Sequence, residues 1–286
     1  MEPGGEVSAL RALMDGDQAR ARAELAARVR RPLLNAALAA YLAGEGGGRV
    51  YDQPAAFTAF IRGGGNIRLY DATTAALAER YDRFGVRSLV DLGCGDGRAL
   101  VPALAASGHC PAVTLVEPSP ALLTQASSAL DGYGGAVTAH ATDATTFATG
   151  TAGGFDLAES TFALHALPHE ERAAMLTALR GHVGHLVLAE FDVPGHPPGS
   201  TEHLTFLADT YEQGLAEYGA DRDLVAQGFL MPVLAGQLAP GATRSTWEQP
   251  ATAWADQLTA CGYRNVVVEP LCDYWSSPAF VLTADA

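Results

Sequence analysis

The sequence predicts an α/β fold built on an open sheet of seven strands. After Gly85, short apolar runs alternate with helical patterns of about 10 to 15 residues, which is typical of repeated strand–helix–strand units and of a parallel sheet. A glycine-rich turn follows the first of these runs and leads into a helical pattern. The chain has 286 residues, of which 48% are hydrophobic and 17% charged, so it can bury the core that such a sheet requires.

The elements are expected in the following order. Residues 8–42 are rich in Ala, Leu and Arg at helical spacing, which predicts two or three helices. Glycine runs at 46–48 and 63–65 predict hinges, and a helix is expected at 69–83. The strands are expected at 87–91, 112–117, 135–140, 155–159, 184–190, 265–269 and 279–283. Helices that connect these strands are expected at 96–107, 119–131, 169–181 and 250–261.

Two segments stand outside the alternation and define the expected domains. Residues 1–84 are expected to form an N-terminal helical lid or extension, and residues 85–286 the sheet domain. Residues 191–248 carry polar and aromatic helical sequence, which predicts a helical cap inserted after the fifth strand. The N-terminal helices are also a candidate homodimer interface.

Charge excludes two classes of partner. All 18 cationic residues are arginine, and the sequence has 32 carboxylate residues, which gives a formal net charge of -14. Binding to nucleic acid through phosphates needs clustered basic residues, so no nucleic-acid partner is expected. A basic membrane-binding surface is disfavoured for the same reason. The acidic start at residues 1–6 and the lack of an apolar run of about 18 residues predict neither a signal peptide nor a membrane span, so we expect a cytoplasmic protein.

The four cysteines do not indicate a metal site. They lie far apart, with no Cys-x-x-Cys pair and no adjacent histidine pair, so neither zinc nor a disulfide framework is expected. The abundance of Ala and Gly, with Arg in place of Lys, suggests a GC-rich bacterial genome.

The most informative segment is residues 88–98, Ser-Leu-Val-Asp-Leu-Gly-Cys-Gly-Asp-Gly-Arg. Glycines in such a turn permit positive φ and let the backbone come close to a ligand. The next expected strand ends at Glu117, whose carboxylate can accept hydrogen bonds from both hydroxyls of a ribose. The turn and the carboxylate together indicate a ligand that contains adenosine.

The turn also indicates which adenosine ligand is bound. A pyrophosphate-binding dinucleotide turn needs glycine at position 98, where Arg98 stands, and Asp96 would repel a pyrophosphate. A cationic sulfonium and ammonium would tolerate that carboxylate. The pattern Asp-x-Gly-x-Gly-x-Gly at residues 91–97 resembles the first motif of class I S-adenosylmethionine-dependent methyltransferases.

The resemblance extends over about residues 85–190 and more loosely to the C-terminus. Similar proteins carry an acidic residue after the third strand that hydrogen-bonds the adenine amino group, and Asp143 stands there. They also carry a stretch like residues 155–165 at the fourth strand. The resemblance implies a Rossmann-like fold, with S-adenosylmethionine as methyl donor and S-adenosylhomocysteine as product.

Segment 51–66 together with Tyr70 suits a lid over the donor, because it mixes aromatic residues with an arginine that could pair with the donor's carboxylate. A plain connector between helices is the alternative. The cofactor-binding residues predicted from the resemblance and this segment are Asp91, Gly93, Cys94, Gly95, Glu117, Pro118, Asp143, Ala144, Ser160, Tyr51 and Arg62.

The acceptor is expected beyond the carboxyl ends of the fourth and fifth strands. Methyl transfer requires donor and acceptor to be held aligned, and a hydroxyl acceptor also needs a general base. The candidate catalytic residues are His165, His203 and Glu190. A structural role for His165, and a packing or solvated face for the helix that carries His203, are the alternatives. The predicted substrate-binding residues are Phe162, Phe191, Phe206, Tyr211, Tyr274 and Trp275.

Methyltransferases with N-terminal helices and a cap after the fifth strand act on small molecules, often bacterial secondary metabolites, antibiotics among them. The resemblance therefore implies a methyltransferase for a small-molecule acceptor, with a hydroxyl favoured over an amine or a carbon. Three alternatives stay open: a methyltransferase fold that uses S-adenosylmethionine only structurally for another reaction, a non-catalytic ligand-binding or scaffold protein, and a nicotinamide-dependent oxidoreductase. Arg98 and Asp96 argue against the last.

Overall fold

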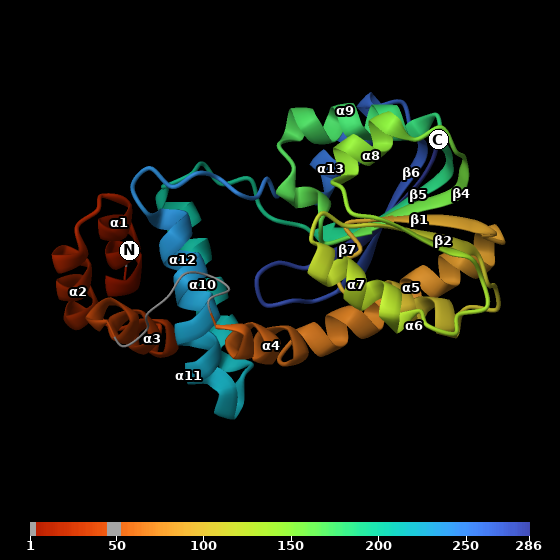
Figure 1. Ribbon diagram of the computed structural model, residues 1–286. Coiled ribbons are helices and arrows are strands. Elements are labelled where there is room, and N and C mark those ends of the chain that lie inside the picture. Colours follow the sequence, from red (N-terminus) through yellow and green to blue (C-terminus); the bar gives the residue numbers. More distant parts are fainter. Residues whose placement is uncertain (1–3, 45–52) are drawn as a thin grey trace. The chain divides into compact units, whose positions relative to one another are not determined.

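The computed structural model describes residues 4–44 and 53–286, and the chain divides into two compact units (Figure 1). The sheet unit comprises residues 68–194, 245–273 and 278–286. The helical unit comprises the described residues up to 67 together with 195–244 and 274–277. The division falls inside one helix, and the predicted limits at 84 and 85 stay a prediction.

Seven strands form the sheet in the order β3-β2-β1-β4-β5-β7-β6. The first five strands of the chain run parallel, and β7 runs antiparallel to both of its neighbours. This confirms the predicted α/β fold with an open seven-stranded sheet. The strands are β1 (Ser88–Leu92), β2 (Ala112–Val116), β3 (Val137–His140), β4 (Phe155–Thr161), β5 (Val183–Phe191), β6 (Arg264–Cys272) and β7 (Ala279–Asp285).

Helices cover both faces of this sheet, which a parallel sheet requires because both of its faces are apolar. Figure 1 shows α5, α6 and α7 on one face and α8, α9 and α13 on the other. Each face has its own buried apolar core. The covering helices are α5 (Asn66–Phe84), α6 (Leu100–Ala106), α7 (Pro120–Ala129), α8 (Ala144–Gly150), α9 (His169–Arg180) and α13 (Ala251–Ala260).

Local sequence explains where these helices begin. The Ser119 hydroxyl caps α7 by accepting the Leu122 N–H, and proline occupies the first turn, where no backbone donor is needed. Asp143 caps α8 in the same way, through the Thr146 N–H. Helix α6 begins at Leu100, later than the predicted residue 96, because the glycine turn occupies the residues between.

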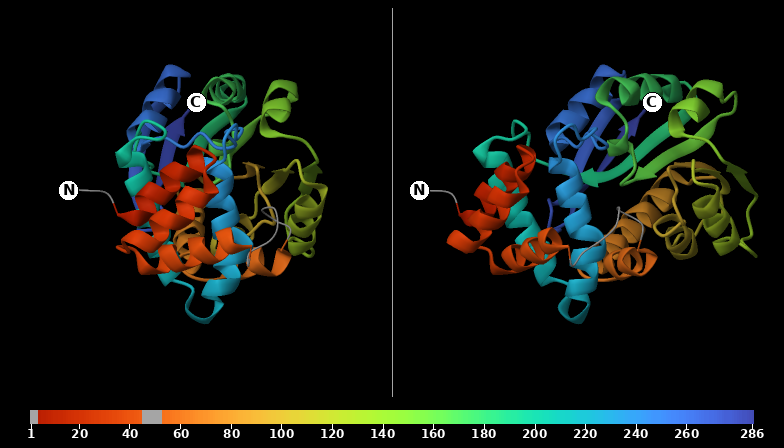
Figure 2. Two further views of the ribbon diagram at one scale, coloured as in Figure 1. Left: turned by 90° about the vertical axis from the view of Figure 1, so that its left-hand side faces the viewer. Right: turned by 60° about the vertical axis from the view of Figure 1, so that its left-hand side comes forward.

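The helical unit is built from two distant parts of the sequence that share one apolar core. Leu10, Leu34 and Leu38 from the N-terminal helices are buried with Leu204 and Leu234 from the cap. Both views in Figure 2 show α1 and α3 beside α10 and α12. The predicted N-terminal helices and the helical cap after β5 are confirmed. The helices are α1 (Gly5–Met14), α2 (Gln18–Ala27), α3 (Pro32–Ala43), α4 (Pro54–Arg62), α10 (Thr201–Ala216), α11 (Arg222–Val225) and α12 (Met231–Leu238).

Shorter turns complete the fold. A 3-10 turn, η2 (Gly219–Asp221), precedes α11, and a π-helical turn, η3 (Ala226–Leu230), joins α11 to α12. Gly228 lies in the π-helical turn where a Cβ would meet the Ala56 Cβ at 2.4 Å, so α4 and η3 pack closely. Within the described residues, no helix is both long and apolar enough to cross a membrane.

Candidate active site

The glycine turn after β1 lies against the end of β2. Gly93, Gly95 and Gly97 have φ values of 76°, 57° and 79°, a region that favours glycine. The N–H groups of Gly93 and Cys94 both donate to the Val116 carbonyl, at 2.8 and 3.2 Å. A Cβ at Gly93 would lie 2.6 Å from the Ala163 Cβ, whereas a Cβ at Gly95 would meet nothing within 4 Å. Gly95 therefore presents bare backbone to open space at the carboxyl edge of the sheet.

Glu117 follows β2 directly and holds this turn. Its carboxylate accepts the Gly95 N–H at 3.2 Å and the Ser119 N–H at 2.9 Å. Pro118 stands between Glu117 and the residue that caps α7. Burial, together with the Asp91 and Glu117 carboxylates, raises the pKa of the Cys94 thiol, which disfavours its nucleophilic thiolate form.

The other predicted donor-site residues in the sheet unit already have partners in the protein. Asp143 accepts the Thr146 N–H at 2.7 Å and the Thr146 hydroxyl at 2.8 Å, and these bonds lower the pKa of its carboxyl. Ala144 is the first residue of α8. The Ser160 hydroxyl is buried and donates to the Leu92 carbonyl at 2.6 Å, so it joins the ends of β1 and β4.

A pair of buried carboxyls lies beside the glycine turn. Asp91 on β1 is in register with Glu159 on β4, and these residues are 2% and 0% exposed. The Tyr81 hydroxyl, from α5, lies 2.8 and 2.7 Å from the two Glu159 oxygens and donates to them. Asp91 Oδ1 is buried and has no hydrogen-bond partner among the described residues.

His165 and Glu190 come together at the carboxyl ends of β4 and β5. His165 lies in the 3-10 turn η1 (Leu164–Ala166), and Glu190 near the end of β5. The imidazole Nδ1 is 2.8 Å from Glu190 Oε2, and the His165 N–H donates to Oε1 at 3.1 Å. Burial lowers the pKa of His165, but the Glu190 carboxylate and then Glu248 outweigh it, so the net pKa is raised. Two of the three predicted catalytic residues thus form a dyad.

Arg172 on α9 supports the turn that carries His165. Its Nη1 donates to the carbonyls of Leu164 and Trp247, each at 3.2 Å. Its Nε donates to Gln257 Oε1 at 2.8 Å, and its guanidinium lies 3.9 Å from the centre of the Trp254 ring. The Trp247 N–H in turn donates to the His165 carbonyl at 2.6 Å. This fully buried arginine therefore ties α9, α13 and two loops together behind the dyad.

An aromatic row extends from the glycine turn to β5. The Phe162 ring stacks on Phe191 at 4.8 Å and meets Tyr70 edge to face at 6.2 Å. The Arg98 guanidinium lies 5.6 Å from the centre of the Tyr70 ring and pairs with Asp96 at 2.8 Å. Phe162 has a φ of 52°, which is strained for a bulky residue and is seen most often at functional sites. The two substrate residues predicted in the sheet unit are thus in contact.

The remaining predicted residues belong to the helical unit. His203 accepts the Gly199 N–H on Nδ1 at 3.1 Å, and the lowered pKa of its ring follows first from burial and then from His196. Phe206 lies 5.9 Å from the His196 ring, and Arg62 is exposed at the end of α4. Tyr51 lies outside the described residues.

Three predicted aromatic residues of the helical unit form a cluster. Trp275 meets Tyr211 edge to face at 5.6 Å and lies 5.5 Å from Tyr274. The Tyr274 hydroxyl donates to the Asn66 Oδ1 at 3.1 Å. The Trp275 ring packs so closely on Gly214 that a Cβ there would lie 2.7 Å from it.

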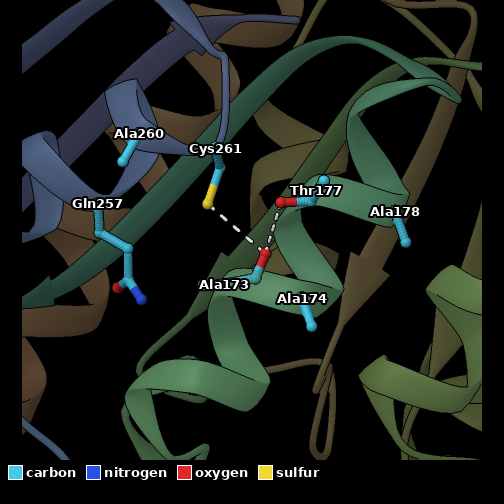
Figure 3. A pocket seen from close by; sticks show the side chains of 7 residues that line it. All are labelled: Ala173, Ala174, Thr177, Ala178, Gln257, Ala260 and Cys261. Atoms are coloured by element: carbon cyan, nitrogen blue, oxygen red, sulfur yellow. Dashed lines mark hydrogen bonds between the residues drawn. The ribbon is translucent and has the colours of Figure 1, made fainter.

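A shallow groove of about 580 Å³ between α9 and α13 lies apart from these residues (Figure 3). The Thr177 hydroxyl and the Cys261 thiol both donate to the Ala173 carbonyl there, at 2.8 and 3.5 Å. None of the predicted site residues lines this groove. The described residues also contain no cluster of three potential metal ligands.

Sequence patterns assigned Tyr70 only to the candidate lid and gave no separate role to Tyr81, Glu159 or Arg172. Glu159 is a single carboxylate inside an apolar strand, and a buried arginine within a helix has the same pattern as an exposed one. A signal for Glu159 was available, because a charged residue in the middle of a buried strand needs a partner.

Comparison with known proteins agrees with this geometry. Residues 89–184 match the family model of the methyltransferase domain. No curated protein matches the chain in sequence. The magnesium protoporphyrin IX methyltransferase of Synechocystis PCC 6803, solved with bound SAH, is similar with a TM-score of 0.51 and 18% identity, over 77% of this chain and 84% of that one. The mitomycin 7-O-methyltransferase is similar with a TM-score of 0.51 and 17% identity, over 97% of this chain and 75% of that one. Residues 89–184 are therefore a methyltransferase domain, and the chain has the fold of the class I S-adenosylmethionine-dependent methyltransferases.

Proposed function

We propose that the protein transfers a methyl group from S-adenosylmethionine to a hydroxyl group of a small-molecule acceptor, in natural-product biosynthesis. The observation that carries this proposal is the His165–Glu190 dyad, which lies at the carboxyl edge of a methyltransferase domain, where a proton acceptor is needed. The donor supplies an activated methyl carbon for in-line displacement.

The sheet unit fits the donor at two points. Gly95 offers bare backbone to a ligand, because no atom lies within 4 Å of the place where its Cβ would stand. Asp91 Oδ1 is a buried acceptor without a partner among the described residues, and unpaired buried acceptors are costly. A ligand with hydroxyl and ammonium donors would satisfy such groups, with Glu117 on the ribose. The ligand would also be surrounded by backbone groups and by strand ends held in place by nearby side chains. The proposed residues are Asp143, Ala144, Pro118 and Ser160.

His165 is the general base in this proposal. With Nδ1–H donating to Glu190, the imidazole Nε2 is the atom left to accept the proton of an acceptor hydroxyl. The Glu190 carboxylate stabilises the imidazolium that results. His203 is the second proposed base, although its Nδ1 accepts a backbone N–H in the helical unit.

Aromatic surface supports a small-molecule acceptor. The Phe162 and Phe191 rings form a stacked wall in the sheet unit, close to the dyad in sequence. The other acceptor contacts proposed from the sequence are Phe206, Tyr211, Tyr274 and Trp275, and the proposed lid residues are Tyr51 and Arg62. One structure of similar fold is a mitomycin 7-O-methyltransferase, which supports a hydroxyl acceptor of this kind. The net charge of -14 argues against nucleic-acid substrates.

The proposal is tested by incubating the protein with S-adenosylmethionine and a panel of small aromatic hydroxyl compounds, and measuring formation of S-adenosylhomocysteine. We expect turnover with at least one phenol or naphthol, and a loss of about 100-fold or more for His165→Gln. Turnover that is unchanged in His165→Gln would contradict the role of the dyad. Methylation of amines or thiols only would contradict the hydroxyl acceptor.

A further inference from the structure

We infer that the free protein holds one proton between Asp91 and Glu159 and releases it when the cationic methyl donor binds. The inference rests on the proposed function and adds a specific role for a buried carboxyl pair. The proton leaves a carboxyl oxygen for the solvent buffer, and no other bond forms or breaks.

The backbone places the two carboxyls side by side. Asp91 on β1 and Glu159 on β4 are partners in a parallel register. Neighbouring strands lie about 4.8 Å apart, and residues in register project from the same face of the sheet. Both residues are at least 98% buried, on the face covered by α5. Water therefore cannot screen the repulsion between two ionised carboxylates here.

The surrounding groups do not compensate two negative charges. The Tyr81 hydroxyl is the hydrogen-bond donor to Glu159, and Asp91 Oδ1 has no partner among the described residues. Arg87, the cation nearest to Asp91 in sequence, is paired with Asp156, and Arg98 is paired with Asp96. No arginine of the described segments forms an ion pair with Asp91 or Glu159. Of the other titratable groups nearby, Glu117 acts on Asp91, Asp91 acts on the Cys94 thiol, and Tyr133 acts on Tyr81.

Two adjacent carboxyls without a cation cannot both ionise, so one keeps its proton. Burial and then the Glu117 carboxylate raise the pKa of Asp91 to about 7. Burial and then Asp91 raise the pKa of Glu159, and the bond from Tyr81 only partly opposes them. The two groups titrate together, so the proton belongs to the pair.

A cationic donor changes this balance. The sulfonium and ammonium of S-adenosylmethionine would bring positive charge to the glycine turn, two residues from Asp91, and favour the doubly ionised pair. The demethylated product keeps its ammonium but has a neutral sulfur, so it should displace less of the proton. The pair would then regain its proton after methyl transfer, and binding of fresh donor would release it again.

Calorimetric titration of the full chain tests this without an acceptor. Binding of S-adenosylmethionine is measured between pH 6 and 8 in phosphate and in Tris, whose ionisation enthalpies differ. We expect release of up to about one proton near pH 6.5, a smaller release with S-adenosylhomocysteine, and donor affinity that rises up to about tenfold per pH unit below the pKa of the pair.

Two variants identify the source of the proton. Glu159→Gln removes one of the two carboxyls, so only burial and Glu117 still raise the pKa of Asp91, and fewer protons should be released than from the unchanged protein while binding remains. Glu170→Gln, an exposed glutamate in the first turn of α9, should release the same number of protons as the unchanged protein. If Glu159→Gln does not fold, infrared difference spectra of the unchanged protein should show loss of a protonated carboxyl band on donor binding.

The outcomes separate the inference from the proposed function. Donor binding with the same heat in both buffers, and no change in the carboxyl band, would overturn the inference and leave the proposed function standing. Absence of donor binding at any pH would overturn the proposed function itself. Equal release by Glu159→Gln and the unchanged protein would place the proton elsewhere and also overturn the inference.

Discussion

Gly95 and Gly132 have similar backbone conformations, but only Gly95 lies in the proposed donor site. Their φ values are 57° and 83°, and at both a Cβ would meet nothing within 4 Å. Alanine at either should therefore cost about 1 kcal/mol of unfolding free energy from backbone strain. Only Gly95→Ala should weaken binding of S-adenosylmethionine, by about tenfold or more, because only there does the added methyl group enter the proposed donor site. Urea unfolding and calorimetry check both effects, and equal donor affinity in the two variants would contradict the site.

The pKa of His165 should depend on the Glu190 carboxylate. Its pKa should lie above the ordinary value of about 6.5, and in Glu190→Gln it should fall below that value, because burial still disfavours the cation once the carboxylate is gone. The pKa is measured by NMR of ¹³C-labelled histidine. The acid limb of turnover should move to lower pH in the variant, along with a lower maximal rate. A His165 pKa that does not respond to Glu190→Gln would show that the two groups are not coupled.

The buried carboxyl pair should make the free protein less stable as pH rises. A carboxyl whose pKa is raised on folding stabilises the native state below its unfolded pKa near 4, and this stabilisation is lost as pH rises through the folded pKa, about 7 for Asp91. The loss is up to roughly 1.4 kcal/mol per pH unit for one titrating group. Glu159→Gln should flatten this slope in urea unfolding between pH 5 and 8. A slope equal to that of the unchanged protein would mean that the pair is ionised throughout.

Sequence patterns could locate some site residues and not others for a physical reason. Asp91 and Glu117 flank a glycine turn, so local sequence marks them. His165 and Glu190 were candidates by their positions after one strand and at the end of another. Glu159 becomes significant only through its register with Asp91, a contact that spans 68 residues of chain and leaves no local pattern.

At the scale of elements, Arg172 should fix the turn that carries His165. Arg172→Met removes the donors to the Leu164 and Trp247 carbonyls and should cost about 3 kcal/mol of unfolding free energy, because these buried acceptors lose their partners. Arg180→Met, an exposed arginine at the end of the same helix, makes the same change in charge and should cost less than about 0.5 kcal/mol.

The position of the turn that carries His165 is tested separately from the free energy of unfolding. The positive charge of Arg172 lowers the pKa of His165, so loss of that charge alone would raise the pKa, whereas loss of the contact with Glu190 would lower it. We expect the ¹³C-histidine spectrum to show a lower His165 pKa in Arg172→Met, an unchanged one in Arg180→Met and a partly restored one in Arg172→Lys. An unchanged His165 titration in folded Arg172→Met would limit the arginine to a general packing role.

Strands were easier to predict than short helices in this chain. Buried parallel strands are short apolar runs bounded by turn residues, and β1, β2 and β4 begin within one residue of the predicted positions. Helix α8 was not predicted, because its seven residues contain three threonines and bury only Phe147 and Ala148. The start of α6 was misplaced because the last part of the turn, with Gly97, was counted as helix.

At the scale of the whole molecule, long-range packing joins segments that the sequence keeps apart. The N-terminal helices bury their leucines against α10 and α12, about 190 residues away along the chain, as in the contact between Arg11 and Gly199. Periodicity can predict each helix but not which helices share a core. A homodimer through the N-terminal helices stays a prediction, which light scattering after size-exclusion chromatography would test by giving a mass of about twice 29.7 kDa.

The identity of the methyl donor is the central claim, and calorimetric titration of the unchanged protein at pH 8 tests it most directly. S-adenosylmethionine and S-adenosylhomocysteine should each bind with a stoichiometry near one, NAD should give no binding heat, and Glu117→Ala should weaken binding of the first two, because the carboxylate beside the glycine turn is lost. Binding of NAD, or no binding of S-adenosylmethionine at millimolar concentration, would contradict the account.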